Sequence, residues 1–507
     1  MRPRLGADRL AGLRAGGRVQ VPEQLPEQVG IVHLGLGAFH RAHQAIFTED
    51  AMAATSSGRW GVCGVTQRSR SVLDQLQPQD GLYTVLVRDD STARARVVGS
   101  VREVLYAAEQ PDAVRDRIAD PSTGVLSLTV TEKGYRRGPG GHLDLRDRSV
   151  QSDLAGGPPA TAVGQVVRGL QHRRATASAP LSVLSCDNLS SNGATLRGLV
   201  RDFCAALPSA EGEPLWAWIE QSARFPSTVV DRIVPATTDR DRAEATALLG
   251  LRDEGVVVAE PFRQWVIEDD FAHDRPAWEK AGAILASEVA PYEMVKLRML
   301  NATHSLLAYT GALAGYATIA SAVRDPALAH AAERLMVEDA APTLCTPPGL
   351  DLDEYRASVL RRFANPALQH RTVQVAMDGS QKLPARLLGI VRDRLNGGAE
   401  PRWAALAVAA WMIFVEQGVD VSGRPLPLED PLADLLRAAA SSGPPTGLVQ
   451  RMLSIGEVFD PELAASDVFV ELLEDHVARF RSSVLRRAYA CAPVPIWQAT
   501  PVPPIPQ

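Results

Sequence analysis

The hydrophobic pattern of the chain changes character near residue 289. Before this point, short β-rich apolar runs alternate with helical patterns, an order typical of a parallel α/β sheet. After it, amphipathic helical patterns follow one another with no strand pattern between them. Strands are expected at 29–34, 60–66, 83–88, 96–101, 125–131, 180–186, 227–235 and 256–270. Later helices are expected at about 291–316, 318–326, 327–340, 352–363, 382–395, 403–417, 431–440, 446–454 and 460–487.

A glycine turn follows the first strand pattern, and a helical pattern begins directly after it. Gly35 permits a tight turn there, and Gly37 lets the backbone approach a pyrophosphate. Strand, glycine turn and helix in this order predict a Rossmann-like dinucleotide-binding domain. His40 stands where a third glycine is usual, so an ordinary βα turn remains the alternative.

The end of the second strand pattern bears on the choice of cofactor. In an NAD-specific Rossmann domain, an Asp or Glu at this place binds the ribose hydroxyls. Here the strand is followed by Gln-Arg-Ser-Arg, and the first carboxylate is Asp74 in the next helical pattern. Arg68 is suited to the 2′-phosphate of NADP, so the sequence leaves NADP open beside NAD.

The segment 291–316 predicts a helix that is apolar nearly all round and therefore belongs in an interior. It nevertheless carries Glu293, Lys296, Asn301 and His304. At about 100° per residue, these side chains lie within an arc of about 140°. Burial lowers the pKa of a lysine and a neutral lysine accepts protons, so Lys296 is a candidate general base. The alternative is that these groups reach a domain edge and pair with one another.

Other polar residues stand at the ends of strand or helix patterns. Asn192 follows a buried strand pattern, where α/β sheets bind ligands, although a helix cap is the alternative for an asparagine there. Asp231 lies between apolar residues. The segment 369–386 is more polar than a linker needs, and the alternative is that Asp378 or Ser380 only caps the helix that follows.

Composition excludes several classes of protein. The net charge of −6 and the absence of basic runs argue against a nucleic-acid partner. The five cysteines form no C-x-x-C pair, so no disulfide framework and no cysteine zinc site is predicted, which fits a reducing cytoplasm. The N-terminus lacks the apolar core of a signal peptide, and the longest apolar run is too short to span a bilayer. We expect a soluble cytoplasmic protein, either a monomer or a small homo-oligomer.

The expected organisation has four segments. The fold class is an α/β Rossmann-like N-terminal domain followed by a mostly α-helical C-terminal domain, which suits a length of 507 residues. The segments are an N-terminal leader at 1–27, the dinucleotide-binding domain at 28–288, the helical substrate and catalytic domain at 289–490, and a Pro-rich tail at 491–507.

Seven motifs occur in order between about residues 30 and 390: GLGAFHRAHQA, TVTEKGY, SCDNLSSNG, PSTVVDRIVP, EPFRQWVIED, KLRMLNATHS and MDGSQKLP. Together they resemble the polyol-specific long-chain dehydrogenases, the family of mannitol 2-dehydrogenase and fructuronate reductase (mannonate oxidoreductase). The resemblance implies an enzyme that transfers a hydride between a nicotinamide cofactor and C2 of a sugar-derived polyol or aldonate. It also implies NAD as the cofactor and no metal.

The resemblance further implies roles for residues in these motifs. Lys296 is the implied general base that takes the C2 hydroxyl proton, and Glu293 connects it to solvent. Asn192 and Asn301 form an oxyanion hole, and His304 orients the substrate. The implied substrate contacts are Asp231 and Lys382, joined by Arg371 for a carboxylate, and the expected cofactor contacts are Gly35, Gly37, Phe39, His40, Arg68 and Glu132.

One departure from the mannitol enzymes bears on the substrate. Gln374 stands eight residues before Lys382, where those enzymes are expected to carry arginine. The run HRTVQVAMDGSQKLP looks closer to the fructuronate reductases, and Arg371 and Arg386 are nearby cations suited to a carboxylate. We therefore favour D-mannonate and D-fructuronate over D-mannitol and D-fructose.

Two other classes of protein share single features with this chain. Tyr292-x-x-x-Lys296 matches the Tyr–Lys pair of short-chain dehydrogenases, but it lies in the helical domain, far beyond the glycine turn. Only in that class would Tyr292→Phe abolish activity. A non-catalytic dinucleotide-binding protein would bind the cofactor without turnover, and the joint presence of Lys296, Asn301 and His304 argues against it.

Overall fold

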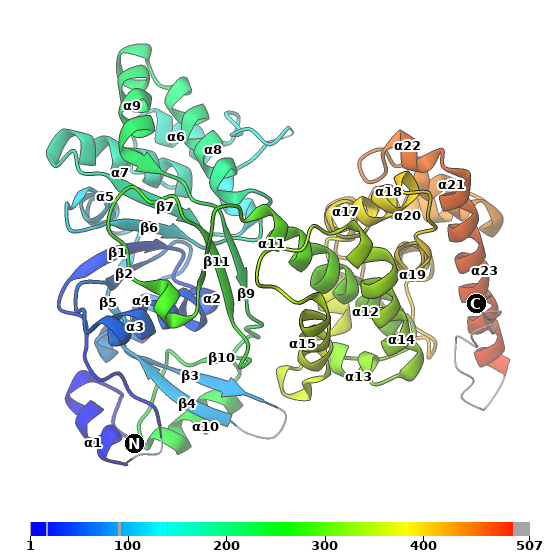
Figure 1. Ribbon diagram of the computed structural model, residues 1–507, viewed down its shortest axis with the longest axis horizontal. Helices are drawn as coiled ribbons and strands as arrows, with labels where there is room; N and C mark the ends of the chain where they lie inside the picture. Colours follow the sequence, from blue (N-terminus) through cyan, green and yellow to red (C-terminus); the bar gives the residue numbers. More distant parts are fainter. Residues whose placement is uncertain (1, 17–18, 90–92, 139, 490–507) are drawn as a thin grey trace. The chain divides into compact units, whose positions relative to one another are not determined.

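The computed structural model describes residues 2–16, 19–89, 93–138 and 140–489. The chain forms two compact units, unit 1 (Met1–Ala290) and unit 2 (Pro291–Gln507) (Figure 1). The Pro-rich tail expected at 491–507 lies outside the described residues.

Unit 1 is built around a sheet of six strands in the order β5-β2-β1-β6-β7-β8, and every neighbouring pair in it is parallel. The chain order reverses at β1, as it does in doubly wound dinucleotide-binding folds. This arrangement confirms the expected Rossmann-like fold. The strands are β1 Val29–Leu34, β2 Gly61–Thr66, β5 Val101–Tyr106, β6 Val125–Leu128, β7 Leu181–Ser185 and β8 Ala223–Arg224.

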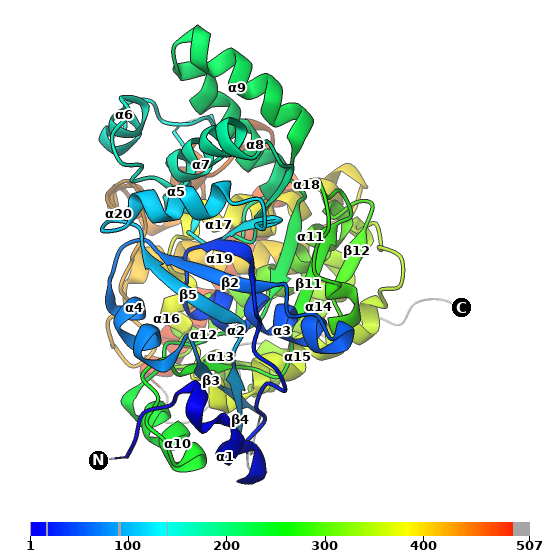
Figure 2. The ribbon, with the colours of Figure 1, turned by 90° about the vertical axis from the view of Figure 1, so that its left-hand side faces the viewer.

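Helices cover both faces of this sheet. Val32 and Leu34 of β1 pack under α5, α7 and α8, whereas Ile31 packs under α2 and α3. Figure 2 shows α5, α7 and α8 together on one side of the sheet. Because successive strand residues face opposite sides, a strand buried on both faces is apolar at nearly every position. The helices of unit 1 are α1 Leu10–Gly16, α2 Ala38–Ala42, α3 Gln44–Thr55, α4 Ser71–Leu76, α5 Pro111–Ala119, α6 Arg148–Leu154, α7 Ala162–Thr176, α8 Asn192–Ala206, α9 Ser209–Ser222 and α10 Asp239–Leu249.

Two smaller sheets complete unit 1 and correct two expected strands. The strand expected at 96–101 is divided between β4 and β5, because Gly99 donates its N–H to Glu49 (2.5 Å) instead of to a neighbouring strand. The strand expected at 256–270 is divided by Pro261, which has no N–H for a ladder. The sheets have the orders β10-β3-β4 and β12-β11-β9, with β3 Tyr83–Arg88, β4 Ala93–Val98, β9 Thr228–Asp231, β10 Val257–Ala259, β11 Gln264–Glu268 and β12 Ile284–Ala286.

The N-terminal segment packs within unit 1. Leu5 and Leu10 are buried in one apolar cluster with Leu86, Val97 and Leu249 of β3, β4 and α10. The Leu5 N–H also donates to the Arg252 carbonyl (2.9 Å). These contacts add the segment to the core of the β10-β3-β4 sheet.

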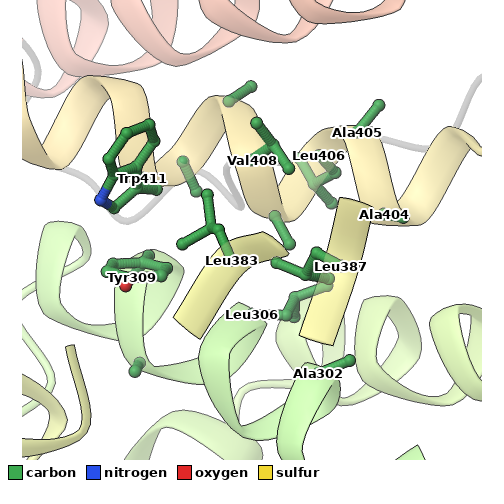
Figure 3. Packing of buried hydrophobic residues seen from close by; sticks show 14 of the residues in the cluster. Ala302, Leu306, Tyr309, Leu383, Leu387, Ala404, Ala405, Leu406, Val408 and Trp411 are labelled. Carbon is green, nitrogen blue, oxygen red and sulfur yellow. The ribbon is translucent and has the colours of Figure 1, made fainter. Parts of the chain in front are cut away.

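Unit 2 is helical, and α19 lies at its centre. Every residue of α19 from Ala404 to Val415 is buried, and the helix packs against α12. In Figure 3, Leu383 and Leu387 fill the space between these two helices. The helices are α11 Ala290–Val295, α12 Ala302–Leu313, α13 Ile319–Val323, α14 Pro326–Arg334, α15 Leu352–Ala364, α16 Thr372–Ala376, α17 Gly379–Leu383, α18 Gly389–Asn396, α19 Arg402–Gln417, α20 Ala433–Ser441, α21 Leu448–Leu453, α22 Pro461–Ala464 and α23 Asp467–Tyr489.

The helix expected over 291–316 is not one regular α-helix. A π-helical segment, η5 (Lys296–Asn301), separates α11 from α12. Each residue of a π-helix turns the chain by less than the about 100° of an α-helix, because its hydrogen bonds join residues five apart. Asn301 therefore lies nearer to the side of Lys296 than a regular α-helix would place it. Two further π-helical segments are η6 (Leu335–Ala340) and η9 (Pro384–Leu388), and both pack against η5.

Candidate active site

The two glycines of the turn after β1 serve different purposes. Gly35 has a φ of +102°, and a Cβ there would come within 2.1 Å of the Thr129 carbonyl oxygen, so the fold itself requires glycine. Gly37 has ordinary backbone angles and is exposed, and the nearest atom to a Cβ there would be at 3.7 Å. Since the chain does not crowd Gly37, the open space is suited to a ligand that approaches the backbone.

Behind this turn, the rings of His33 and His40 stack with centroids 3.5 Å apart. His33 is held by Ser127 and Thr129, with 2.8 Å from each ring nitrogen to a hydroxyl. Burial lowers the pKa of His33 to about 3 and holds that of His40 well below its usual value, so both rings are neutral at pH 7. The Gln44 side chain lies close enough to act on the pKa of His40, but no hydrogen bond of normal geometry joins either ring nitrogen of His40 to the described residues. Phe39 is half-buried and stacks on His43 (5.0 Å).

The polar side chains that follow β2 differ in their partners. The Gln67 side chain forms a pair of reciprocal amide hydrogen bonds with Gln165, each 2.9 Å long. Arg70 pairs with Asp74 (3.0 Å) and with Glu109. Arg68 is exposed and has no ion pair within the described residues. Of the two arginines, Arg68 is thus the one whose charge is not already matched by a carboxylate.

A short turn follows β6, which ends at Leu128 and not at 131 as expected. Residues 130–135, here called the 130–135 turn, include Glu132, which is exposed. Thr131 has φ +68° and ψ 160°, a conformation rare for any residue except glycine. The Asp187 carboxylate accepts hydrogen bonds from the N–H groups of Val130 (3.0 Å) and Thr131 (2.9 Å) and from the Tyr135 hydroxyl (2.8 Å).

Asn192 is buried at the first position of α8, and its side chain does not cap that helix. Its amide nitrogen donates to the carbonyls of Asp187 (3.0 Å) and Thr228 (2.9 Å), and its amide oxygen accepts from the Thr228 N–H (2.8 Å). Both amide hydrogens are therefore used within unit 1. A substrate oxygen would have to replace one of these two carbonyls.

Asp231 ends β9 and is buried. The next residue, Arg232, donates from Nε and Nη2 to the Glu260 carbonyl (3.0 and 2.7 Å) and from Nη1 to the Ala42 carbonyl. Burial lowers the pKa of Arg232 to about 10. These bonds connect the strand that carries Asp231 to α2, the helix that follows the glycine turn.

In unit 2, η5 begins at Lys296 and ends at Asn301. Glu293, Lys296 and Asn301 are half-buried, which corrects the expectation of a wholly buried segment. The side-chain amide of Asn301 makes no hydrogen bond within the described residues, in contrast to that of Asn192. Asn301 therefore keeps both amide hydrogens available to a ligand.

His304 stands one turn further on, in α12, and is buried. Its ring stacks on Phe363 (4.8 Å between centroids) and meets the edge of His370 (4.8 Å). Burial holds the pKa of His304 well below its usual value, and the charges of Arg386 and Arg362 lower it further. His304 is thus neutral, and its Nε2 has no hydrogen-bond partner among the described residues.

The cations near His304 only partly match the expected ones. Lys382 ends on the carbonyls of Met377 (2.5 Å) and Val375 (3.4 Å), and Arg386 donates to the Ser305 hydroxyl (3.1 Å). Arg371 is exposed, and no contact joins its side chain to His304 within the described residues. Of the two arginines expected to bind a carboxylate, Arg386 thus lies near His304 and Arg371 does not contact it.

Arg362 is a buried cation near His304 that sequence reasoning missed. The spacing of apolar residues could have revealed that Arg362 is buried. The buried stripe of α15 is formed by residues at i, i+4, i+7 and i+8, which are Tyr355, Val359, Arg362 and Phe363. An arginine within an apolar stripe is the unusual feature that points to a role.

The alternative that Asp378 caps the next helix is wrong. This residue stands at the N-cap of α17 with a left-handed backbone, and its side chain makes no cap hydrogen bond. The carboxylate of Asp430 instead accepts from the N–H (2.8 Å) and the hydroxyl (2.5 Å) of Ser380. A residue distant in sequence thus supplies the cap.

Two features are absent from the described residues. No group of three or more His, Cys, Asp or Glu side chains is placed to hold a metal ion there. Within the same residues, no helix has both the length and the apolar character needed to cross a membrane.

Two family models match the segments that carry these residues. The Mannitol dehydrogenase Rossmann domain matches residues 29–280, and the Mannitol dehydrogenase C-terminal domain matches residues 288–480. The chain belongs to the mannitol dehydrogenase family. This confirms the resemblance inferred from the seven motifs. The protein is accordingly an oxidoreductase that acts on a secondary alcohol of a polyol or an aldonate.

Similar proteins cover nearly the whole chain. D-mannonate oxidoreductase of Escherichia coli (strain K12) is 42% identical over 446 residues, which are 87% of this chain and 90% of that protein. Pseudomonas fluorescens mannitol 2-dehydrogenase, solved as a ternary complex with NAD and D-mannitol, is 34% identical with a TM-score of 0.84 and covers 96% of this chain and 99% of its own. A substrate-free D-sorbitol dehydrogenase is 31% identical with a TM-score of 0.82 and covers 96% of this chain and 100% of its own.

Proposed function

We propose that this mannitol dehydrogenase family member interconverts D-mannonate and D-fructuronate with NAD as its cofactor. The observation that carries the choice of substrate is that the charges of Arg386 and of the buried Arg362 both act on His304, because guanidinium groups bind carboxylates. The similarity to D-mannonate oxidoreductase supports the same choice. The alternative is D-mannitol and D-fructose, which the similarity to mannitol 2-dehydrogenase favours.

NAD is proposed because it is bound in the similar mannitol 2-dehydrogenase. The residues present fit a dinucleotide: the open space at Gly37 admits a pyrophosphate, and the partnerless nitrogens of the buried His40 can hydrogen-bond a ligand. Glu132 on the 130–135 turn and Phe39 are further proposed contacts. A bound NAD would accept the hydride from the carbinol carbon that becomes the ketone of the product, which is C2 when the substrate is numbered as a ketose.

Residues of this chain handle the proton and the developing charge. Lys296 takes the proton of the C2 hydroxyl at its Nζ, and Glu293 passes that proton toward solvent. Asn301 donates from its amide to the C2 oxygen, and Asn192 does so by exchanging its bond to the Asp187 carbonyl. The neutral His304 hydrogen-bonds a substrate hydroxyl through Nε2.

Substrate hydroxyls are held by Asp231 and Lys382 in this proposal. We assign the carboxylate to Arg362 and Arg386 instead of to Arg371, the cation expected to bind it, because Arg371 is exposed. A charge-assisted hydrogen bond to a carboxylate contributes about 1.5–3 kcal/mol, which is about ten- to a hundredfold in affinity. This difference is large enough to separate an aldonate from a neutral polyol.

The test is oxidation of NADH by the purified protein with D-fructuronate and with D-fructose side by side. We expect kcat/KM to be at least about tenfold higher with D-fructuronate. Arg386→Gln should raise KM for D-fructuronate by about tenfold or more and change KM for D-fructose by less than about threefold. Arg371→Gln is the matched control and should change neither.

Each outcome of this test separates the candidates. Higher kcat/KM with D-fructose, unchanged by Arg386→Gln, would favour the mannitol reaction. NADH binding without turnover of any polyol or aldonate would favour a non-catalytic dinucleotide-binding protein.

A further inference from the structure

One connected set of hydrogen bonds in unit 1 joins the residues that follow β6 and β7 to the first residue of β9. Asp187, just after β7, holds the turn that follows β6 through its carboxylate and the start of α8 through its carbonyl. The Tyr135 hydroxyl, which donates to this carboxylate, also lies 2.6 Å from the Ser185 hydroxyl. Thr228 of β9 donates its hydroxyl to the Ser185 carbonyl (2.7 Å). Asp187 takes part in both groups of bonds, those to the turn after β6 and those to the start of α8.

Both ends of the 130–135 turn depend on the same carboxylate. The N–H groups of Val130 and Thr131 bind it at the start of the turn, and the Tyr135 hydroxyl binds it at the end. Asp187 is largely buried, which raises the pKa of its carboxyl, and these three donors lower that pKa again. A buried carboxylate is costly without such donors, so the turn and the carboxylate stabilise each other.

The turn is held in a strained conformation. Thr131 is β-branched and has φ +68° and ψ 160°, which persists only where the surroundings fix it. Its side chain and those of Glu132 and Lys133 are exposed and make no hydrogen bond or ion pair within the described residues. A turn that only connected β6 to the next element would need neither a strained residue nor exposed side chains held in fixed positions. These features therefore indicate a ligand-binding role.

The position of the turn places it beside the dinucleotide site. Thr129 donates its hydroxyl to the Gly35 carbonyl (2.9 Å), and the Thr129 carbonyl lies against Gly35 itself. In the sheet order, β2 with Arg68 lies on one side of β1, and β6 and β7 lie on the other. A dinucleotide bound across β1, with its adenosine over β2, has its nicotinamide half over β6 and β7.

We propose that Asp187 is a positioning residue for the nicotinamide half of the cofactor. It fixes the 130–135 turn so that Thr131, Glu132 and Lys133 meet that half of the dinucleotide. The role rests on the proposed function, because it needs a dinucleotide at the carboxyl ends of the strands.

The test is Asp187→Asn in the full-length chain, titrated with NADH and with ADP. An asparagine keeps one acceptor oxygen but turns an N–H₂ toward the second backbone N–H, so the turn loses its anchor. We expect NADH affinity to fall by about tenfold or more and ADP affinity to change by less than about twofold, because ADP lacks the nicotinamide half. Tyr135→Phe removes one of the three donors and should weaken NADH binding in the same direction by less.

Asp253→Asn is the matched control. Asp253 is also buried and accepts two backbone N–H groups, from Thr84 (2.6 Å) and Gly255 (2.7 Å), and one side-chain donor, Gln79 (2.7 Å). It belongs to the region of the β10-β3-β4 sheet, so this variant should lower the melting temperature and leave the ratio of NADH to ADP affinity unchanged.

Three results would overturn the proposal. Unchanged NADH affinity in Asp187→Asn, with a wild type that binds NADH, contradicts the positioning role alone. An equal loss for NADH and ADP shows general loosening of the unit instead. A wild type that binds no NADH removes the proposed function and this role together.

Discussion

Lys296 and Asn301 are the first and last residues of one π-helical segment. The segment places the proposed base and the proposed oxyanion donor on neighbouring parts of the helix surface, nearer than a regular α-helix would. π-Helical turns within α-helices occur frequently at functional sites. The proposed chemistry of unit 2 therefore depends on a local departure from α-helical geometry.

The two asparagines of the proposed oxyanion hole should respond differently to removal of their amides. Asn301→Ala should lower kcat by about a hundredfold to a thousandfold and leave the melting temperature unchanged, because its amide has no partner within the described residues. Asn192→Ala should lower both, because its amide holds the backbone of Asp187 and Thr228. Steady-state kinetics and thermal unfolding of both variants give the comparison. Equal effects on the melting temperature would contradict the assignment.

Cofactor choice should depend on Arg68. We expect NADPH to support measurable turnover, and Arg68→Ala to lower kcat/KM with NADPH by about tenfold or more and with NADH by less than about threefold. Arg70→Ala is the control, because Arg70 is already paired with Asp74 and Glu109. If Arg68→Ala affected NADH and NADPH equally, Arg68 would not contact a 2′-phosphate.

The stability of unit 2 should depend on pH through Asp339. This buried carboxylate in η6 accepts the N–H groups of Trp403 (2.7 Å) and Ala404 (2.8 Å) at the start of α19, and burial raises its pKa to about 6. Because the folded pKa lies above that of the unfolded chain, the contribution of Asp339 to stability falls as pH rises from about 4 to about 6. The free energy of unfolding of Asp339→Asn minus that of wild type should be more positive at pH 7 than at pH 4, by about 3 kcal/mol.

Denaturant unfolding of wild type and Asp339→Asn at both pH values measures this difference, and titration of all other groups cancels in the comparison. The exposed Asp351 also accepts two N–H groups at a helix start (2.8 and 3.0 Å). Asp351→Asn should bring no gain at pH 7. A pH-independent difference for Asp339→Asn would show that the carboxylate is not destabilised by its burial.

Features with a local cause were predictable from the sequence. The apolar runs at β1, β2, β6 and β7 and the glycine turn at Gly35 follow from strand burial and a positive φ, and the structure has them within a few residues. The change to helices near residue 289 is likewise a matter of periodicity, and α11 begins at Ala290.

Features with a distant cause were not predictable. The split of the strand at Gly99 depends on Glu49, and the cap of α17 depends on Asp430, both far away in sequence. The π-helical segment at Lys296 follows the same apolar pattern as an α-helix, so periodicity alone could not reveal it. The hydrogen bonds of Asn192 could not be predicted either, because its partner Thr228 is brought close only by the fold.

The most direct test of the proposed mechanism is the Lys296→Ala variant, measured for turnover of D-fructuronate with NADH and for NADH binding. We expect a loss of turnover by several orders of magnitude with NADH affinity within about twofold of wild type, because Lys296 moves the proton and does not hold the cofactor. The control is Lys280→Ala, which should keep full turnover. Turnover of Lys296→Ala within about tenfold of wild type would contradict the assignment of Lys296 as the general base.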